Sequence, residues 1–201
     1  TNTDGATRLD LMFTFQLVAN FFSDCANVPS SEEGDISLKL TDWAEVNEIS
    51  SEGAHDALND CYLMVKMSKI IQDNANQAWR ASLKGSSKAG NLSIIQSAPF
   101  AMLGEVFRKK KFTYPITFCG QNFNFPNEVA VADLYFDPDT LEDLSDTELL
   151  EQIGSSGSAI RKLKINRSLP LISSKQIPDL PNYLDIPEDQ LNERALKIKN
   201  N

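Results

Sequence analysis

The residues with the clearest chemical potential are His55 and Asp60, in the segment AHDALND. His55 is the single histidine among 201 residues, and Asp60 follows it five positions later. Imidazole and carboxylate groups transfer protons, and carboxylates also bind divalent cations. A lone pair at this spacing is more often structural, with the histidine at the surface or capping a helix. The surrounding sequence therefore has to decide between a catalytic and a structural interpretation.

Three other kinds of chemistry fit the sequence poorly. An HD-type phosphohydrolase would use His55 and Asp56, but it needs further histidines for its metals and the chain has none. The cysteines Cys25, Cys61 and Cys119 are odd in number and form no CxxC pair, so neither a zinc site nor a disulfide framework is expected. Cys61 falls on a predicted buried helix stripe, which argues against a nucleophile. The glycine-containing segment GSSGS at 154–158 has no Walker lysine and is better explained as a loop that ends a helix.

Apolar spacing predicts helices in the first part of the chain. We expect one helix over 8–23 with Asp10 in its first turn, and a second from Asp42 with Thr41 as N-cap. A longer helix is expected over 56–74, followed by a flexible connection over 85–91. The residues that share the predicted buried stripe of this longer helix are Ala57, Cys61, Met64, Val65, Ser68 and Ile71.

The second part of the chain changes in character. Residues 97–136 are rich in aromatic residues and short alternating runs, which predicts a small antiparallel β unit. A single helix with an acidic start is expected over 137–154, then a returning strand that Pro170 terminates. The tail is expected to turn helical from Pro187 and to end without a partner in this chain.

The context of His55 and Asp60 resembles the third exonuclease motif of the DEDDh family of 3′–5′ exonucleases. The motif runs LKLTDWAEVNEI, then AHDALND, then an apolar helix. The segment RLDLM before the first helix is similar to the exonuclease I type of that family. So are the segments FAMLGEVF, VAVADLYFDPDTLEDLSDTELLEQI, RKLKINRSLPLI and LDIPEDQLNERALKI, in the order and spacing of its SH3-like domain and the helical domain after it. The resemblance covers nearly the whole chain.

The resemblance implies an α+β fold: the C-terminal part of an RNase H-like exonuclease domain, an SH3-like β domain, and the start of a helical domain. The implied boundaries are 1–84 for the exonuclease part, 85–97 for a linker, 98–172 for the SH3-like domain and 173–201 for the helical part. It also implies roles for the two motif residues. Asp60 would be a ligand of one of two Mg²⁺ ions, and His55 would be the general base that activates the attacking water. The substrate implied is single-stranded DNA, with single-stranded-DNA-binding protein as a further partner.

The sequence departs from the family at two motifs. The Asp-x-Glu of the first motif and the Asp of the second are expected upstream of Thr1 and do not occur in this chain. We therefore expect a fragment of a longer enzyme that is inactive alone, because one carboxylate cannot hold two cations that each need about six oxygen ligands. The complete enzyme is expected to be a cytoplasmic monomer. No apolar run approaches the roughly 18 residues that span a membrane.

The net charge of −9 argues against a protein that coats DNA through bulk charge. DNA affinity would have to be local, and we expect it in a basic turn between strands that consists of Arg108, Lys109, Lys110 and Lys111. The nearby Phe107, Phe112 and Tyr114 would stack on bases, unless they are core residues. A second basic run comprises Arg161, Lys162, Lys164 and Arg167. The main alternative is a non-catalytic module that binds nucleic acid or protein; an RNA-directed DEDDh nuclease is a weaker one, because of the β-rich segment.

Overall fold

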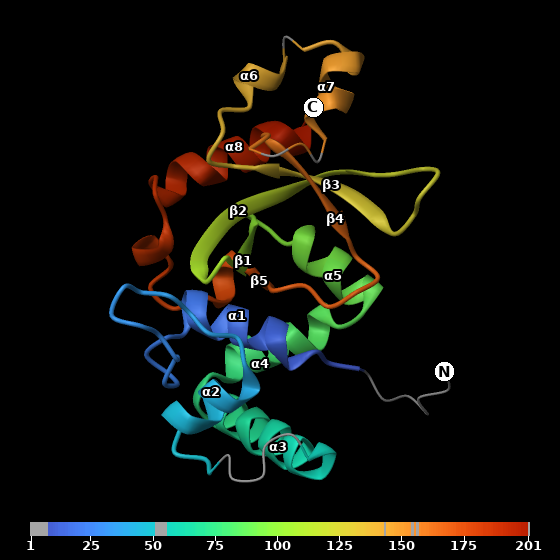
Figure 1. The fold of residues 1–201 in the computed structure, drawn as a ribbon. Coiled ribbons are helices and arrows are strands. Elements are labelled where there is room, and N and C mark those ends of the chain that lie inside the picture. Colours follow the sequence, from blue (N-terminus) through green and yellow to red (C-terminus); the bar gives the residue numbers. More distant parts are fainter. Residues whose placement is uncertain (1–7, 51–55, 143, 154, 156, 201) are drawn as a thin grey trace.

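The computed structural model has an α+β fold in which five helices precede an antiparallel sheet, two short helices lie between its third and fourth strands, and one helix follows its last strand (Figure 1). The residues that the structure describes are 8–50, 56–142, 144–153, 155 and 157–200. The helices are α1 (Leu11–Phe21), α2 (Leu40–Val46), α3 (Ala57–Asn74), α4 (Asn76–Gly85), α5 (Lys88–Ile95), α6 (Asp139–Glu142), α7 (Asp146–Gln152) and α8 (Glu188–Asn200), with 3₁₀ turns η1 (Ser174–Gln176) and η2 (Leu180–Tyr183). The strands are β1 (Ala101–Phe107), β2 (Lys110–Gln121), β3 (Glu128–Asp133), β4 (Ile160–Lys164) and β5 (Leu171–Ser173). The expected α+β class is confirmed.

The five strands form one sheet in the order β4-β3-β2-β1-β5, and every neighbouring pair is antiparallel. The first three strands confirm the antiparallel unit expected over 97–136. A register shift between Phe118 and Gly120 marks a bulge in β2. Such a bulge bends the strand, and Figure 1 shows the long β2 curving between its two neighbours.

Both faces of the sheet contribute side chains to a hydrophobic core. One face packs with α1 and α8 in a large core that also holds the helices below the sheet in Figure 1. The other face packs against α5 in a smaller core. The largest buried side chains of the first core include Phe15, Trp43, Phe100 and Met102, and those of the second include Ile94, Ile95, Leu103 and Ile116. Since both cores draw on the same strands, the helical and β parts are held together by shared packing.

Helix α1 is fixed to β1 by buried amide side chains. Gln16 accepts a hydrogen bond from the backbone N–H of Val106 at 2.8 Å, and Asn20 donates to the carbonyl of Glu105 at 3.3 Å. The two elements come close at Gly104, where a Cβ atom would lie 2.6 Å from the Phe21 ring. Only glycine fits at that contact.

Several sequence predictions about the first part need correction. Asp10 is the N-cap of α1, accepting a hydrogen bond from Met12 N at 3.1 Å, and does not lie in the first turn. The N-cap of α2 is Lys39, so Thr41 lies inside that helix. The flexible connection expected over 85–91 is mostly helix α5, whose Ser87 N-cap accepts a hydrogen bond from Gly90 N. The sequence analysis did not identify Ser87 as an N-cap because it lies within a run of small polar residues.

Three predictions about the second part were wrong as well. The segment 137–154 forms two short helices, because Ser145 starts a new one with a capping box to Glu148. The expected single returning strand is divided into β4 and β5, which lie at opposite edges of the sheet. The last helix, α8, has a partner in this chain, since Leu191 and Ala195 are buried in the larger core.

Candidate active-site helix and nucleic-acid groove

Asp60 lies in the first turn of α3, with a partly buried side chain. Its backbone N–H donates to the carbonyl of the N-cap residue Asp56 at 3.0 Å. The helix dipole favours a carboxylate in the first turn, so a structural role alone would also explain Asp60 at this position. His55 lies outside the described residues, so the pairing of His55 with Asp60 stays a prediction. No group of three or more His, Cys, Asp or Glu side chains that could hold a metal ion occurs within the part of the chain that is described.

Helix α3 carries apolar residues on two opposite sides. Leu63, Met67 and Ile71 form its buried side. The other side is open: the exposed fractions of Leu58, Tyr62 and Val65 are 60%, 58% and 68%. A helix that is apolar all round is normally covered all round. Helix α3 does not meet that description, because Lys69 is exposed on the same side, so its open side presents a mixture of apolar and charged side chains.

The predicted buried stripe of α3 was wrong except at Ile71. Met64 and Val65 are exposed, and so is Cys61, whose assignment to the core fails. Periodicity identifies an apolar side but cannot choose between two of them, and α2 and α4 pack on the side that contains Leu63.

A groove of about 620 Å³ runs beside α3. Five stretches of the chain form it: the residues that lead into and begin α1, which include the carboxylate of Asp10, then Leu38 and Leu40, Met64 of α3, Ser86, and the loop after β4. Its basic lining residues are Arg8 and Arg167, both exposed, and neither forms an ion pair with a described residue. The groove therefore joins the helix of Asp60 to two exposed guanidinium groups, a kind of group that binds phosphate well.

The loop that carries Arg167 is held in place by a buried amide. Asn91 of α5 donates hydrogen bonds to the carbonyl oxygens of Ile165, at 3.0 Å, and Arg167, at 2.8 Å. Gly85, at the end of α4, brings that helix close to the same loop: a Cβ there would lie 3.2 Å from the carbonyl oxygen of Leu169. The backbone at Arg167 is thus fixed, while its side chain extends into solvent.

A turn joins β1 and β2 near the predicted place, but it consists of Arg108 and Lys109 alone, because Lys110 and Lys111 already belong to β2. Its two central residues, Arg108 and Lys109, have φ angles of 47° and 65°. Positive φ at both positions is the geometry of a tight hairpin turn that usually takes Asn or Gly, so two cationic residues there are unusual. Arg108, Lys109, Lys110 and Lys111 are all exposed.

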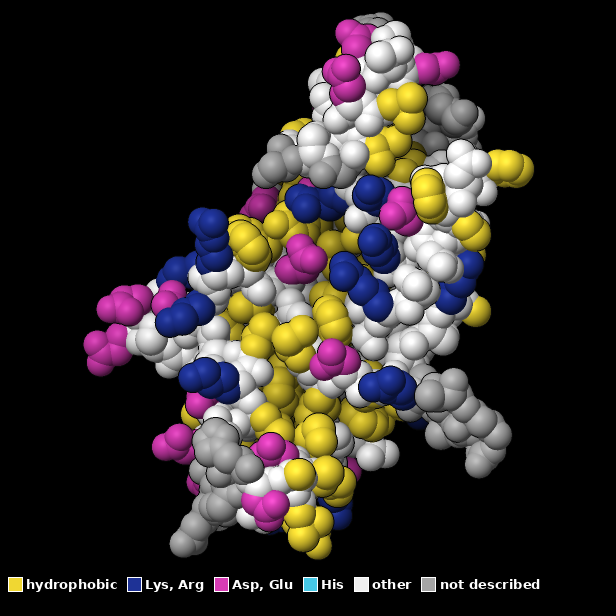
Figure 2. Space-filling view, turned by 45° about the vertical axis from the view of Figure 1, so that its right-hand side comes forward, with side chains coloured by type: hydrophobic (Ala, Val, Ile, Leu, Met, Phe, Trp, Pro, Cys, Tyr) yellow, Lys and Arg dark blue, Asp and Glu magenta, His cyan; other side chains and the backbone are white. Residues whose placement is uncertain are grey.

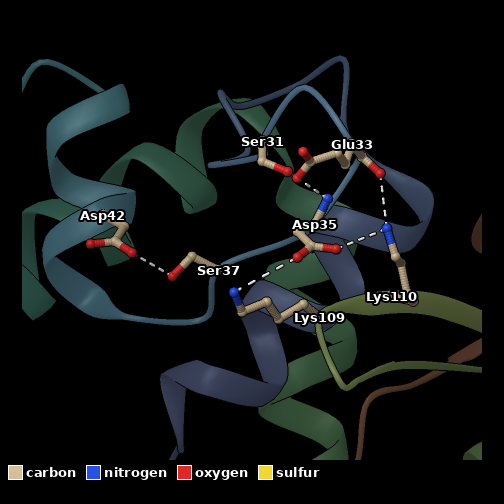
Figure 3. A network of polar contacts seen from close by, with 7 residues as sticks. All are labelled: Ser31, Glu33, Asp35, Ser37, Asp42, Lys109 and Lys110. Carbon is tan, nitrogen blue, oxygen red and sulfur yellow. Dashed lines mark hydrogen bonds and ion pairs between the residues drawn. The ribbon is translucent and has the colours of Figure 1, made fainter.

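Two of these four cations are already engaged by the acidic loop 31–35 (Figure 3). The Lys110 ammonium lies 2.8 Å from the Asp35 carboxylate and also donates to the carbonyl of Glu33. Lys109 is 3.7 Å from Asp35, and its own carbonyl accepts from Ile36 N at 2.7 Å. The hydrogen bond from Lys110 holds the pKa of Asp35 below its usual value. These contacts give Lys109 and Lys110 a structural role that the sequence did not reveal.

The cavity next to this loop is mixed in charge. It has a volume of about 820 Å³, and its lining includes the carboxylates of Glu33, Asp35, Asp42 and Glu45 beside Lys39 and Lys109. Asp42 accepts a hydrogen bond from Ser37, as Figure 3 shows. A surface with this many carboxylates repels phosphate. The groove with Arg8 and Arg167 is the better match to a nucleic-acid backbone.

Aromatic residues on the sheet surface are available to a ligand. The exposed fractions of Phe107 and Phe112 are 61% and 40%, so the interpretation of these two as core residues is wrong. The Phe112 and Tyr114 rings are parallel with centroids 6.4 Å apart, and the Arg161 guanidinium lies 3.6 Å from the Tyr114 centroid. Arg161 is also bound to buried Asp133, so it is part of the fold more than of the solvated basic run. Figure 2 shows a face on which Lys and Arg side chains border a band of hydrophobic ones.

No protein-family model matches the chain. Two curated relatives do. The chain is 23% identical over 214 aligned residues to exodeoxyribonuclease I of Haemophilus influenzae, covering 98% of this chain and 45% of the relative. It is also 23% identical to exodeoxyribonuclease I of Buchnera aphidicola, covering 98% of this chain and 50% of the relative. The chain resembles exodeoxyribonuclease I. This confirms the resemblance predicted from the sequence motifs, and the chain spans about half the length of the curated relatives it matches.

Solved structures of exonuclease I share the fold. The enzyme from Methylocaldum szegediense matches with a TM-score of 0.79 and 19% identity, over 100% of this chain and 46% of that one. E. coli exonuclease I in complex with a dA16 oligonucleotide matches with a TM-score of 0.76 and 18% identity, over 96% of this chain and 44% of that one. A complex of exonuclease I with SSB-Ct matches with a TM-score of 0.71 and 17% identity, over 96% and 44%.

Sequence reasoning missed the groove as a site. Arg8 was noted only as part of RLDLM, and Arg167 only as one member of a basic run. No local pattern links residue 8 with residues 64 and 167, since their proximity depends on how α1 and α5 pack on the sheet. The sequence feature that could have pointed to the groove is that both arginines lie in segments that resemble exonuclease I.

Proposed function

We propose that this chain forms part of a 3′–5′ exonuclease that degrades single-stranded DNA by two-metal-ion hydrolysis. The observation that carries the proposal is the groove that joins Met64, on the helix of Asp60, to Arg8 and Arg167. Guanidinium groups suit phosphate oxygens geometrically. DNA in this groove would pass directly beside the turn of α3 on which Asp60 stands.

In this proposal Asp60 would hold a Mg²⁺ ion through one carboxylate oxygen, and His55 would accept the proton of the attacking water. The Mg²⁺ ions, when bound, stabilise the charge that develops on the attacking and leaving oxygens. The described residues offer no three-residue metal group, so they do not fit two ions by themselves. The other carboxylates of the site would come from a further segment that packs on the open side of α3, and the 201-residue chain alone would be inactive.

We propose the domain division 1–84, 85–97, 98–172 and 173–201, with an RNase H-like part, a linker, an SH3-like part and a helical part. The linker would then contain helix α5. The short, curved antiparallel sheet and its small core with α5 support the SH3-like assignment. The closing helix α8 supports the start of a helical domain.

For partners we propose single-stranded DNA and, following the SSB-Ct complex of exonuclease I, single-stranded-DNA-binding protein. We further propose that the complete enzyme is a cytoplasmic monomer. Cys25, Cys61 and Cys119 are free thiols, as a reducing compartment requires. No described helix is both long enough and apolar enough to span a bilayer.

The groove is tested by salt titration of oligonucleotide binding to this chain. Each lost phosphate contact lowers the log–log salt slope by about 0.7 for single strands. The variant with Arg8→Ala and Arg167→Ala should therefore lower it by about 1.4. Lys175→Ala removes an exposed cation outside the groove and should leave the slope unchanged. Equal slopes for the double variant and the control would exclude the groove as the DNA path.

A second candidate function is a non-catalytic module that binds single-stranded DNA. The observation that favours it is that the exposed guanidinium groups of Arg8 and Arg167 can bind phosphate without a metal ion. The two candidates make the same prediction for the groove but differ for Asp60. Replacement of Asp60 abolishes hydrolysis by a complete enzyme and has no consequence for a module that only binds.

A further inference from the structure

The hairpin of β2 and β3 ends in a loop, residues 122–127 with sequence NFNFPN, whose phenylalanines are exposed. The exposed fractions of Phe123 and Phe125 are 98% and 62%. Figure 1 shows this hairpin projecting from the body of the molecule. Neither ring belongs to the two cores. No residue of this loop lines the groove beside α3.

The loop is ordered by its own hydrogen bonds. The Asn122 side-chain oxygen accepts from the backbone N–H groups of Asn124, at 3.0 Å, and Phe125, at 3.1 Å. The backbone closes the hairpin with Asn122 N to Glu128 O at 2.9 Å and Glu128 N to Phe125 O at 2.8 Å. A ligand that binds the rings therefore meets a tip whose backbone is already arranged, which reduces the entropy lost on binding.

The charged residues near this loop lie at its base and not at its tip. The loop itself has no charged residue, but the adjacent strand β4 presents the exposed residues Lys162 and Lys164. Lys164 pairs in register with Glu128, directly at the base of the loop. Lys162 lies 3.9 Å from the Glu128 carboxylate. Aromatic rings at a neutral tip with ammonium groups at its base match the chemistry of a single strand, whose bases stack on rings and whose phosphates attract cations.

A folded protein fits this tip less well. Two phenylalanines offer at most roughly 300–500 Å² of contact area, whereas a stable protein interface buries about 800 Å² on each partner. The tip is also convex, so it does not enclose a partner. A nucleobase needs only one ring face to stack on, and the loop offers two.

We propose that Phe123 and Phe125 are base-stacking residues that bind single-stranded nucleic acid outside the groove, with Lys164 available to the neighbouring phosphate. The inference rests on the proposed function, because it extends the contact with single-stranded DNA to a second surface. It predicts that the two rings contribute to affinity by stacking, so that their removal weakens binding without removing the Lys164 contact to phosphate.

The test is binding of a single-stranded oligonucleotide that contains 2-aminopurine to the 201-residue chain, with Phe123→Ala and Phe125→Ala. Stacking contributes enough that each variant should bind about 5-fold or more weakly. The salt slope should stay unchanged, because no phosphate contact is lost. Phe123→Trp should retain affinity. Leu196→Ala removes an exposed apolar side chain on α8 and should have no effect. Because both rings are exposed, the melting temperature should not change.

The outcomes separate the two proposals. Wild-type affinity and unchanged 2-aminopurine fluorescence in both Phe→Ala variants, with the groove variant still impaired, would overturn the stacking role and leave the groove intact. A lower salt slope in the Phe→Ala variants would also overturn it, because the loop would then act through charge. If the wild-type chain does not bind the oligonucleotide, both the stacking role and the groove are overturned.

Discussion

Replacement of Arg161 tests how much its ion pair with the buried Asp133 stabilises the folded protein. The side chain of Asp133 is 3% exposed and that of Arg161 is 27% exposed. The guanidinium donates two hydrogen bonds to the same carboxylate oxygen, at 3.1 and 3.0 Å, and the other oxygen accepts from Tyr135 N at 3.1 Å. Arg161→Met keeps much of the aliphatic length over Tyr114 but leaves a buried carboxylate without its counter-ion.

The expected loss is about 3 kcal/mol at pH 7, the lower end of the range for breaking a buried pair. The lower end applies because Arg161 is partly exposed. This corresponds to a change of roughly 100- to 200-fold in the unfolding equilibrium. Urea unfolding followed by circular dichroism measures it, with Lys164→Met on the same strand as the control, which should cost less than about 0.5 kcal/mol.

The loss should depend on pH with a defined sign. Burial already raises the pKa of Asp133 in the wild type, and Arg161 opposes that rise. Without Arg161 the folded-state pKa rises further. A raised folded pKa gives stability that is full below the unfolded value of about 3.9 and is lost as the pH rises through the folded value. The deficit of Arg161→Met should therefore be small near pH 4 and complete at pH 7. A stability deficit below about 1 kcal/mol at pH 7, or one that is equal at both pH values, would show that Arg161 does not compensate the buried charge of Asp133.

Three further results are expected. Asp35→Asn should release Lys109 and Lys110 and steepen the salt slope of DNA binding by up to about 1.4. Because the pKa of Asp35 is lowered in the folded state, its ion pairs with the two lysines are complete above about pH 4 and are lost as the pH falls through that lowered pKa. Variant and wild type should therefore have the same salt slope at low pH. Gly104→Ala forces a Cβ to within 2.6 Å of the Phe21 ring and should cost about 1–3 kcal/mol in urea unfolding, whereas Gly120→Ala, which meets nothing within 4 Å, should not. The purified 201-residue chain should show no Mg²⁺-dependent degradation of a 3′-labelled oligonucleotide, and clear degradation would mean that it holds a complete metal site.

The α+β class, the helix of Asp60 and the basic hairpin turn could be predicted because each depends on local signals. Apolar spacing marks α3, and alternation with turn residues marks β1 to β3. The division of 137–154 into two helices was also encoded locally, by Ser145 and Glu148. It was missed because the acidic run around them looks continuous.

The rest depends on contacts between distant segments. The choice of the buried side of α3 requires knowledge of where α2 and α4 pack. The pairing of Lys109 and Lys110 with Asp35 spans about seventy residues, and the groove brings Arg8 and Arg167 together across most of the chain. None of these leaves a local pattern. The resemblance to exodeoxyribonuclease I suggested the function but did not indicate the groove.

The most direct test of the central claim is the rate at which a complete parent enzyme, one that also carries an Asp-x-Glu segment, degrades 3′-labelled single-stranded DNA when Asp60 is changed to Asn. Asp73→Asn is the matched control, since Asp73 is an exposed carboxylate on the same helix. Asp60→Asn should remove a metal ligand and lower the rate by several orders of magnitude, on the order of 10³-fold or more, while Asp73→Asn should leave it unchanged. Near-normal turnover by the Asp60→Asn enzyme would contradict the claim that α3 belongs to the catalytic centre.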